Sequence, residues 1–164
     1  MDTRTVPARL RIARLREHLA QLGAHAVLVP SADPHLSEYL PDHWQGREWF
    51  SGFTGSMGTL VVTATEAALF ADSRYWEQAE RELSGSGIAL VKIATAAAAS
   101  HLEWIAGHVA AGQVLVVDGD VLGLADAKAL ADTCGRAGIT LRTTQDRSEE
   151  HTSELQSRLH LVCR

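Results

Sequence analysis

The sequence predicts an α/β domain of three layers, in which a mixed, mostly parallel sheet with one β-hairpin lies between helices. Helical and strand patterns alternate along the chain, which is the order that builds such a sheet. Residues 26–29 and 114–117 are continuously apolar, as strands buried on both faces are. The 164 residues suffice for one compact domain, which we expect to occupy residues 1–146.

In the first half of the chain, Pro7 suits a first helical turn, and leucines recur at helical spacing until Gly23. Asp33 is a candidate cap for a short helix that ends at Leu40. Two runs of strand-forming residues follow a glycine-rich segment, and the short connection at 65–66 predicts a hairpin. The predicted elements are a helix over 7–23, a short helix over 33–40, and strands over 26–29, 59–63 and 67–71.

In the second half, Asp72 or Ser73 is the predicted cap of a helix that contains Tyr75, Trp76 and Leu83. An alanine-rich stretch opens the next helix, which ends before a glycine at position 112. The remaining predicted elements are strands over 88–93, 114–117 and 139–143, the helix that opens at 96–99, and a helix over 124–136.

The charge balance gives no electrostatic footprint for nucleic acid, because 15 Lys and Arg stand against 20 Asp and Glu, for a net charge of -5. No stretch approaches the roughly 18 apolar residues of a membrane helix. The N-terminus lacks the apolar core of a secretory signal, so we expect a cytoplasmic location. Two cysteines cannot form a disulfide framework, and Cys134 is expected to be a buried small hydrophobe.

The composition changes near residue 147. Residues 1–146 contain 25 Ala and 13 Gly, whereas the last 18 residues contain neither. A solvated helix is one interpretation, since Leu155, Leu159 and Val162 fall at helical spacing. We favour another, because the eleven residues 147–157 resemble the translation of a common sequencing-adapter oligonucleotide. Residues 147–164 are therefore expected to be a non-native tail outside the domain.

The standard catalytic signatures are weak or absent. The segment 52–58 has three glycines but no Lys of a phosphate-binding loop, and Ser56 falls outside the G-x-S-x-G frame. Eight histidines occur without metal-ligand spacing, so we expect no metal site in this chain. Asp118 and Asp120 form either a carboxylate pair or an ordinary turn, and we favour the turn.

Two features rise above this background. In the first, the segment 43–53, four of the nine aromatic residues gather with His43 and Arg47. Such a segment is either a core anchor for a long loop or an interface. The second is the segment 72–75 at the carboxyl end of a strand, where open α/β sheets bind ligands. There Arg74 is either a solvated side chain or a planar donor fork for a carboxylate or carbonyl.

These stretches resemble a known family. The matching letters lie at 30–39 (PSADPHLSEY), 47–59 (REWFSGFTGSMGT), 71–75 (ADSRY) and 78–79. Together they resemble the N-terminal domain of Xaa-Pro aminopeptidases, in the creatinase and prolidase superfamily, over residues 8–143. The Asp-x-His-x-Ser-Glu-Tyr element is similar to that of longer members, in which two such domains precede a catalytic domain. Ser73 departs from the pattern, which usually has Gly there.

The resemblance implies a creatinase-type domain of a cytoplasmic metallopeptidase, a hydrolase that releases an N-terminal residue preceding proline. The two divalent metal ions of such enzymes, usually manganese, belong to a catalytic domain whose Asp, Asp, His, Glu and Glu ligands are absent here. We therefore expect a truncated chain that is inactive alone. The implied partners are that catalytic domain and a peptide with proline second, in a parent that forms homodimers; neither nucleic acid nor a membrane is expected.

By position, the resemblance makes Arg74 the residue that reaches toward the bound peptide. The expected supporting residues are Asp72, Tyr75, Arg47 and His43, and the aromatic segment is expected to pack on the neighbouring domain. No catalytic residue and no metal ligand is expected within the chain. Two alternatives stand beside this interpretation: the equivalent domain of a prolidase or creatinase relative, and a non-catalytic binding or oligomerisation module.

Overall fold

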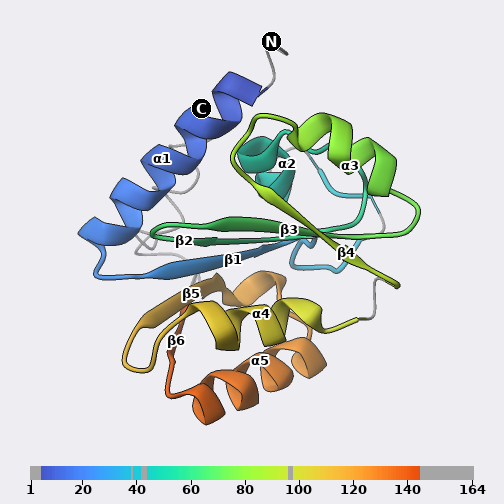
Figure 1. Cartoon of the computed structure of the whole chain (residues 1–164). Coiled ribbons are helices and arrows are strands. Elements are labelled where there is room, and N and C mark those ends of the chain that lie inside the picture. The colour runs from blue at the N-terminus through green and yellow to red at the C-terminus, as the bar shows by residue number, and fades with distance from the viewer. Residues whose placement is uncertain (1–4, 38, 42–43, 96–97, 145–164) are drawn as a thin grey trace.

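The computed structural model describes residues 5–37, 39–41, 44–95 and 98–144. Six strands form one sheet in the order β4-β3-β2-β1-β5-β6 (Figure 1). The strands are β1 (Ala26–Pro30), β2 (Thr59–Thr63), β3 (Ala67–Asp72), β4 (Ala89–Ile93), β5 (Val114–Asp118) and β6 (Thr140–Thr144). The helices are α1 (Thr5–Gln21), α2 (Gly46–Ser51), α3 (Trp76–Leu83), α4 (Ser100–His108) and α5 (Leu124–Ala137), with the short 3-10 helix η2 (Gly119–Val121).

The sheet is mixed and mostly parallel, as predicted. The pairs β1–β5, β3–β4 and β5–β6 are parallel, whereas β1–β2 and β2–β3 are antiparallel. The consecutive strands β2 and β3 form the predicted hairpin. Because β2 runs against both of its neighbours, the loop that enters β2 lies at the same edge of the sheet as the ends of β1 and β3.

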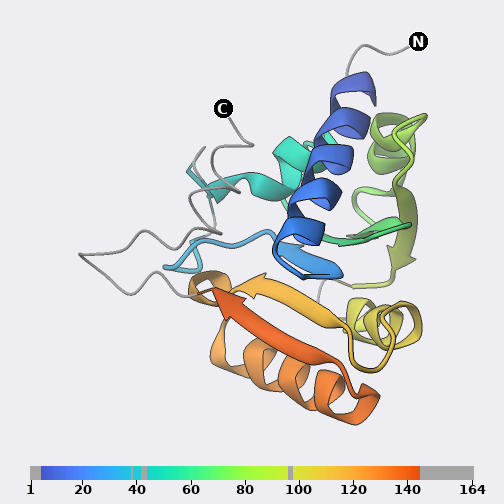
Figure 2. The same ribbon diagram turned by 90° about the vertical axis from the view of Figure 1, so that its left-hand side faces the viewer.

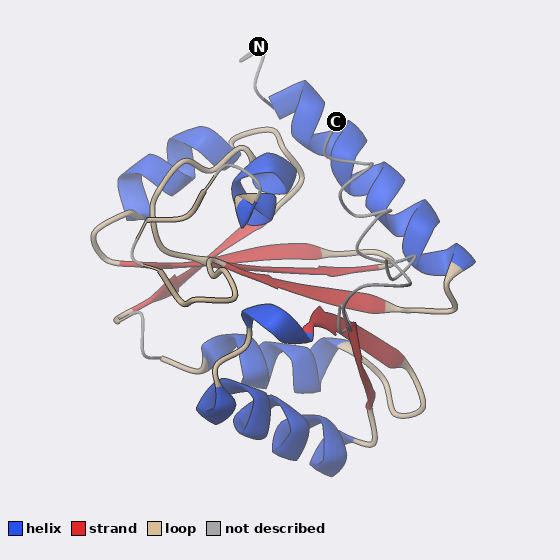
Figure 3. Cartoon of the chain, turned by 180° about the vertical axis from the view of Figure 1, so that it is seen from behind, coloured by secondary structure: helices blue, strands red, loops and turns tan. Residues whose placement is uncertain are grey.

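Helices cover both faces of the sheet, which confirms the three-layer fold. Helices α1, α2 and α3 lie on one face, and α4 and α5 lie on the other (Figures 1 and 3). The view in Figure 2 shows α5 alongside β5 and β6, on the face opposite α1.

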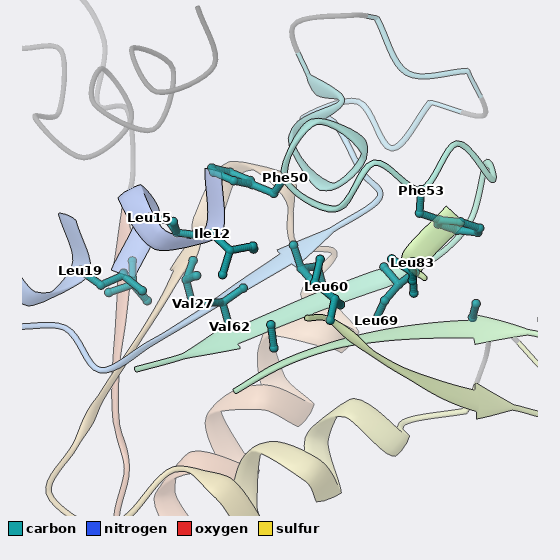
Figure 4. Packing of buried hydrophobic residues seen from close by; sticks show 14 of the residues in the cluster. Ile12, Leu15, Leu19, Val27, Phe50, Phe53, Leu60, Val62, Leu69 and Leu83 are labelled. Carbon is teal, nitrogen blue, oxygen red and sulfur yellow. The ribbon is translucent and has the colours of Figure 1, made fainter. Parts of the chain in front are cut away.

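The pleat of the strands gives each face its own hydrophobic core. In β3, Leu69 packs into the core under α1, α2 and α3, while its neighbour Phe70 packs into the core under α4 and α5. Figure 4 shows how Ile12 and Leu15 of α1 point into the first core. Burying a side chain of this size contributes about 1.5–3 kcal/mol. All six residues of β3 are buried, so the strand ends on a buried carboxylate, that of Asp72.

The predicted helix over 33–40 is wrong. The described residues of this stretch form turns, and the side chain of Asp33 caps a turn by accepting hydrogen bonds from the backbone N–H groups of His35 and Ser37 at 3.0 and 2.9 Å. Leu36 has a φ of 52°, in the left-handed region that a helix does not use. Asp side chains that bond the nearby backbone in this way compete with helix formation.

Helix α2 was not predicted, and the start of α3 differs from the prediction. Helix α2 has six residues and no side-chain cap at its start, and it is followed by Gly52 at the C-cap position, whose φ is 74°. Tyr75 occupies the N-cap position of α3 and gives no side-chain hydrogen bond to it. The predicted cap, Asp72, instead binds the turn that precedes the helix. Helix α4 begins at Ser100; of its predicted opening at 96–99, residues 96 and 97 lie outside the described residues.

Within the described residues, no helix combines the length and the apolar character needed to cross a membrane.

Candidate functional site

The candidate site lies at the carboxyl end of β3, where the chain leaves the sheet through the turn 72–75. The Oδ1 atom of Asp72 accepts hydrogen bonds from the backbone N–H and from Nε of Arg74, at 3.1 and 2.9 Å. Its Oδ2 atom accepts one from Nη2 of Arg74 at 2.9 Å. The two side chains therefore form a bidentate ion pair, which fixes the plane of the guanidinium as well as its position.

Each member of this ion pair favours the charged form of the other. Hydrogen bonds from the Arg74 side chain hold the pKa of Asp72 below its ordinary value, against the opposing effect of burial. The same bonds raise the pKa of Arg74. The Arg74 side chain is 62 % exposed and uses two of its five N–H groups, so three have no partner among the described residues.

Tyr75 supports this pair from the side. The guanidinium carbon of Arg74 lies 5.2 Å from the centre of the Tyr75 ring, within the range of a cation–π contact. The ring meets the Phe53 ring edge to face, with centroids 6.0 Å apart. Its hydroxyl forms a 2.6 Å hydrogen bond with the hydroxyl of Ser56. The turn after β3 is thus joined to the glycine-rich segment 52–58.

Arg47, a predicted supporting residue, is buried, with 4 % of its surface exposed. Its Nε donates to Ser31 Oγ at 2.6 Å, Nη1 donates to the Phe53 carbonyl at 2.9 Å, and Nη2 donates to the Gly55 carbonyl at 2.6 Å. Burial lowers the pKa of Arg47 to about 10, so the side chain is still a cation at neutral pH. Ser31 in turn donates to the Gly58 carbonyl at 2.7 Å. Arg47 therefore fixes the loop that enters β2 and is not exposed to a ligand.

A buried carboxylate fixes the same loop from the other side. Glu82 of α3 accepts hydrogen bonds from the backbone N–H and the hydroxyl of Thr54, at 2.8 and 2.9 Å. Gln78, one turn earlier, donates to the hydroxyl of Thr54 at 2.8 Å and to Glu82 at 3.2 Å. Sequence reasoning missed Glu82 and Thr54. A signal existed, since Ala79 and Leu83 mark the buried face of α3 and Glu82 falls on that face.

Both phenylalanines of the aromatic segment lie in the core. Phe50 and Phe53 are 2 % and 0 % exposed, and Figure 4 shows both beside the first core. Trp49 is partly buried, meets Phe50 edge to face at 4.9 Å and lies 4.4 Å from the guanidinium of Arg11. For these residues the structure supports the core-anchor alternative. His43, the remaining supporting prediction, lies outside the described residues.

The turn capped by Asp33 makes stability depend on pH in acid. Hydrogen bonding by the backbone N–H of Ser37 is the main cause that lowers the pKa of Asp33. A carboxyl group with a lowered folded-state pKa stabilises the fold above its unfolded-state pKa, and this contribution is lost as the pH falls through the folded-state value. We expect the melting temperature to drop below about pH 4, and the drop to be smaller in Asp33→Asn.

The Asn variant is a sharp test because both backbone N–H groups bind the same oxygen, Oδ1, which an amide also offers. Circular dichroism melts across the acid range provide the measurement. Asp132→Asn, at an exposed position of α5, is the matched control and should retain the full drop. Identical pH profiles for Asp33→Asn and the unsubstituted chain would contradict the prediction.

The remaining candidate residues, Asp118, Cys134 and His101, have contacts that explain them by their place in the fold. Asp118 Oδ1 accepts a 3.0 Å hydrogen bond from the backbone N–H of Asp120, which agrees with the turn interpretation. Cys134 is buried, and burial raises the pKa of its thiol. Burial lowers the pKa of His101, since it disfavours the charged imidazolium, and the His101 ring packs edge to face on Phe70. None of these surroundings activates a nucleophile or a base.

The structure thus brings Asp72, Arg74, Tyr75 and Ser56 together at one edge of the sheet. The guanidinium carbon of Arg47 lies over the Phe53 ring, 5.0 Å from its centre. The arrangement can hold a carboxylate or a carbonyl oxygen on an oriented guanidinium.

Comparison with known proteins gives one family. The profile of the Creatinase/Prolidase N-terminal domain matches residues 11–146. A curated relative named Probable Xaa-Pro aminopeptidase P, from Paracoccidioides brasiliensis, is 37 % identical over 142 residues, which is 87 % of this chain and 23 % of the relative. Xaa-Pro aminopeptidase 2 of Rattus norvegicus is 49 % identical over 74 residues, 45 % of this chain and 11 % of the relative. The chain spans less than a quarter of the length of these relatives.

Solved structures share the fold. The X-prolyl aminopeptidase of Caenorhabditis elegans, described as a cytosolic enzyme with a di-nuclear active site, superposes with a TM-score of 0.75 at 28 % identity. That match covers 85 % of this chain and 24 % of the enzyme. The N-terminal domain of the cytoplasmic peptidase PepQ from Mycobacterium tuberculosis gives 0.60 at 24 % identity, covering 83 % of this chain and 93 % of that domain. This second likeness shows the fold alone.

Proposed function

This chain belongs to the Creatinase/Prolidase N-terminal domain family, and we propose that it is the substrate-positioning domain of an Xaa-Pro aminopeptidase, which releases an N-terminal residue preceding proline. The curated Xaa-Pro aminopeptidases support this class over the prolidase alternative. The Xaa-Pro dipeptidase of Bacillus anthracis and the prolidase of Pyrococcus horikoshii match at only 21 % and 16 % identity and share the fold alone.

One observation carries the proposal: the guanidinium of Arg74 is exposed and yet oriented. An exposed Arg side chain ordinarily loses conformational entropy when it binds a ligand. Here the bidentate bond to the buried Asp72 removes much of that freedom before any ligand arrives. The three remaining N–H groups of Arg74 suit a backbone carbonyl or carboxylate of a peptide. Arg74 is therefore the proposed substrate-binding residue, with Asp72 and Tyr75 as its supports.

The metal centre is proposed to lie in a separate catalytic domain. The described residues contain no group of three or more His, Cys, Asp or Glu side chains that could hold a metal ion. A two-metal hydrolytic site needs several such ligands, so these residues do not fit it. The proposal assigns two divalent ions, with manganese as our expectation, to the catalytic domain.

The remaining parts of the proposal concern partners and location. The partners are the catalytic domain and a peptide with proline at the second position, in a homodimeric parent located in the cytoplasm. Sequencing the source locus beyond codon 146 tests the domain arrangement. We expect codons for two Asp, one His and two Glu ligands downstream, and a sequence different from residues 147–164. A locus that encodes residues 147–164 in frame would contradict the proposed domain boundary and the adapter origin.

The isolated 164-residue chain is expected to be inactive. The described residues contain no group of side chains that could hold a metal ion and activate a water molecule. An Xaa-Pro peptide incubated with the chain and manganese should therefore remain intact. Release of the first residue, followed by chromatography, is the measurement. Turnover that grows in proportion to the amount of chain would contradict the proposal.

In the full-length parent, Arg74→Ala is expected to lower kcat/KM for an Xaa-Pro peptide by about tenfold or more, the factor set by one charged hydrogen bond. The kcat/KM of Arg74→Lys should fall between those of the unsubstituted enzyme and Arg74→Ala, because an ammonium keeps the charge but not the planar fork. Arg81→Ala removes an exposed arginine from α3 and is the matched control. Wild-type kinetics for Arg74→Ala would return this residue to the solvated alternative.

A further inference from the structure

The hydrogen bond between Ser56 and Tyr75 joins two segments 19 residues apart. Both hydroxyls lie at the exposed surface, where a hydrogen bond contributes little to the stability of a fold unless it holds something in place. The bond is nevertheless short, at 2.6 Å. The bond holds the Tyr75 ring, so its effect depends on what that ring contacts.

The ring of Tyr75 has a contact on each side. The guanidinium of Arg74 lies over its face, and the Phe53 ring meets it in an edge-to-face arrangement. The Phe53 ring is held in place, because it is fully buried and the guanidinium of Arg47 lies over it. The hydroxyl bond to Ser56 fixes the far end of the Tyr75 ring and so removes its remaining freedom to tilt.

Ser56 itself is held by a rigid loop. On one side of it, Thr54 is bound through both its backbone N–H and its hydroxyl to the buried carboxylate of Glu82. The carbonyl of Gly55, directly before Ser56, accepts a hydrogen bond from the buried Arg47. The hydroxyl of Ser56 therefore offers Tyr75 a fixed partner rather than a mobile one.

We propose that Ser56 is a positioning residue, which acts through the Tyr75 ring to hold the Arg74 guanidinium in one orientation. The inference rests on the proposed function of Arg74. The bidentate bond to Asp72 holds one edge of the guanidinium, and the Tyr75 ring packs against the same group. Loss of either hydroxyl frees the ring, and the ion pair then opens more often.

The test follows the Nε–H proton of Arg74 by nuclear magnetic resonance in the 164-residue chain, because this proton is donated to Asp72. Its exchange with water is expected to speed up by about two- to tenfold in Tyr75→Phe and in Ser56→Ala, the factor of one lost hydrogen bond. The double variant should exchange no faster than either single variant, since both remove the same bond. Ser56→Thr keeps a hydroxyl and should restore slow exchange.

The matched control is Ser84→Ala, an exposed serine just after α3, which should leave the exchange rate unchanged. Melting temperatures measured alongside separate positioning from general destabilisation, which would speed up exchange at backbone amides of the core as well. Unchanged Nε–H exchange in both single variants, or additive effects in the double variant, would overturn the proposal.

The kinetics of the full-length parent distinguish this proposal from the proposed function. If exchange speeds up but Arg74→Ala has wild-type kcat/KM, the positioning of Arg74 stands and its role in substrate binding fails. If exchange speeds up and Arg74→Ala also lowers kcat/KM, then Ser56→Ala should lower kcat/KM by less than Arg74→Ala does. Ser56→Thr, which keeps the hydroxyl, should have a kcat/KM close to that of the unsubstituted enzyme.

Discussion

Replacing Arg47 with alanine is expected to lower the free energy of unfolding by about 3–5 kcal/mol, because it leaves buried acceptors without a donor. The carbonyls of Phe53 and Gly55 and the hydroxyl of Ser31 all depend on this one guanidinium. Truncation to a methyl group also removes packing against the Phe53 ring. Urea unfolding followed by circular dichroism measures the loss.

Arg14→Ala, at an exposed position of α1, is the matched control and should change stability by no more than about 0.5 kcal/mol. Arg47→Lys keeps the charge but cannot serve three acceptors from a planar fork, so it should recover only part of the stability. A loss below about 1 kcal/mol in Arg47→Ala would mean that water replaces the guanidinium and that the loop does not depend on it.

Gly55→Ala has the second largest expected effect, about 2–3 kcal/mol, because a side chain at this position would overpack the core. A Cβ atom on Gly55 would lie 2.2 Å from Cζ of Phe53 and under 3 Å from both ring Cε atoms. The Phe53 ring cannot move aside easily, since Arg47 and Tyr75 pack against it. The glycine is therefore required for space.

Gly107→Ala is the matched control for this prediction. A Cβ atom on Gly107, within α4, would meet nothing within 4 Å. Alanine in a helix is favoured over glycine by about 1 kcal/mol, so this variant should be neutral or more stable. Equal thermal stability of the two variants would contradict the packing argument for Gly55.

The sequence predicted the strands well because their signal is local. The strand over 59–63 matches β2 at both ends, and the two continuous apolar runs became the buried strands β1 and β5. The failures lie where side chains, rather than periodicity, decide the backbone. Asp33 binds two backbone N–H groups and so stabilises a turn, and α2 is too short to show a helical period or to be stable without the burial of Phe50.

The candidate site was predictable only in part. Arg74 is identifiable because it follows a strand end, a position that the sequence reveals. Arg47 is predicted only as a supporting residue, in a segment for which core and interface roles both stay open. Its burial was not predictable, because two of its partners are backbone carbonyls that no sequence pattern displays. For Ser56 the sequence shows only that it lies outside a nucleophile motif, and its hydrogen-bond partner, Tyr75, is 19 residues away. The predicted hairpin brings the start of β2 near the end of β3, but the pairing of these two side chains shows only in the folded structure.

The antiparallel course of β2 also bears on the order in which the chain can assemble. The loop and the turn of the site join across short sequence distances, at most the 28 residues between Thr54 and Glu82. By contrast, β1 meets β5 beside a contact between His25 and Val114, 89 residues apart. Closing a longer loop costs more entropy. The four strands β4, β3, β2 and β1, with the Arg74 site at their edge, can therefore pair before β5 and β6 join them.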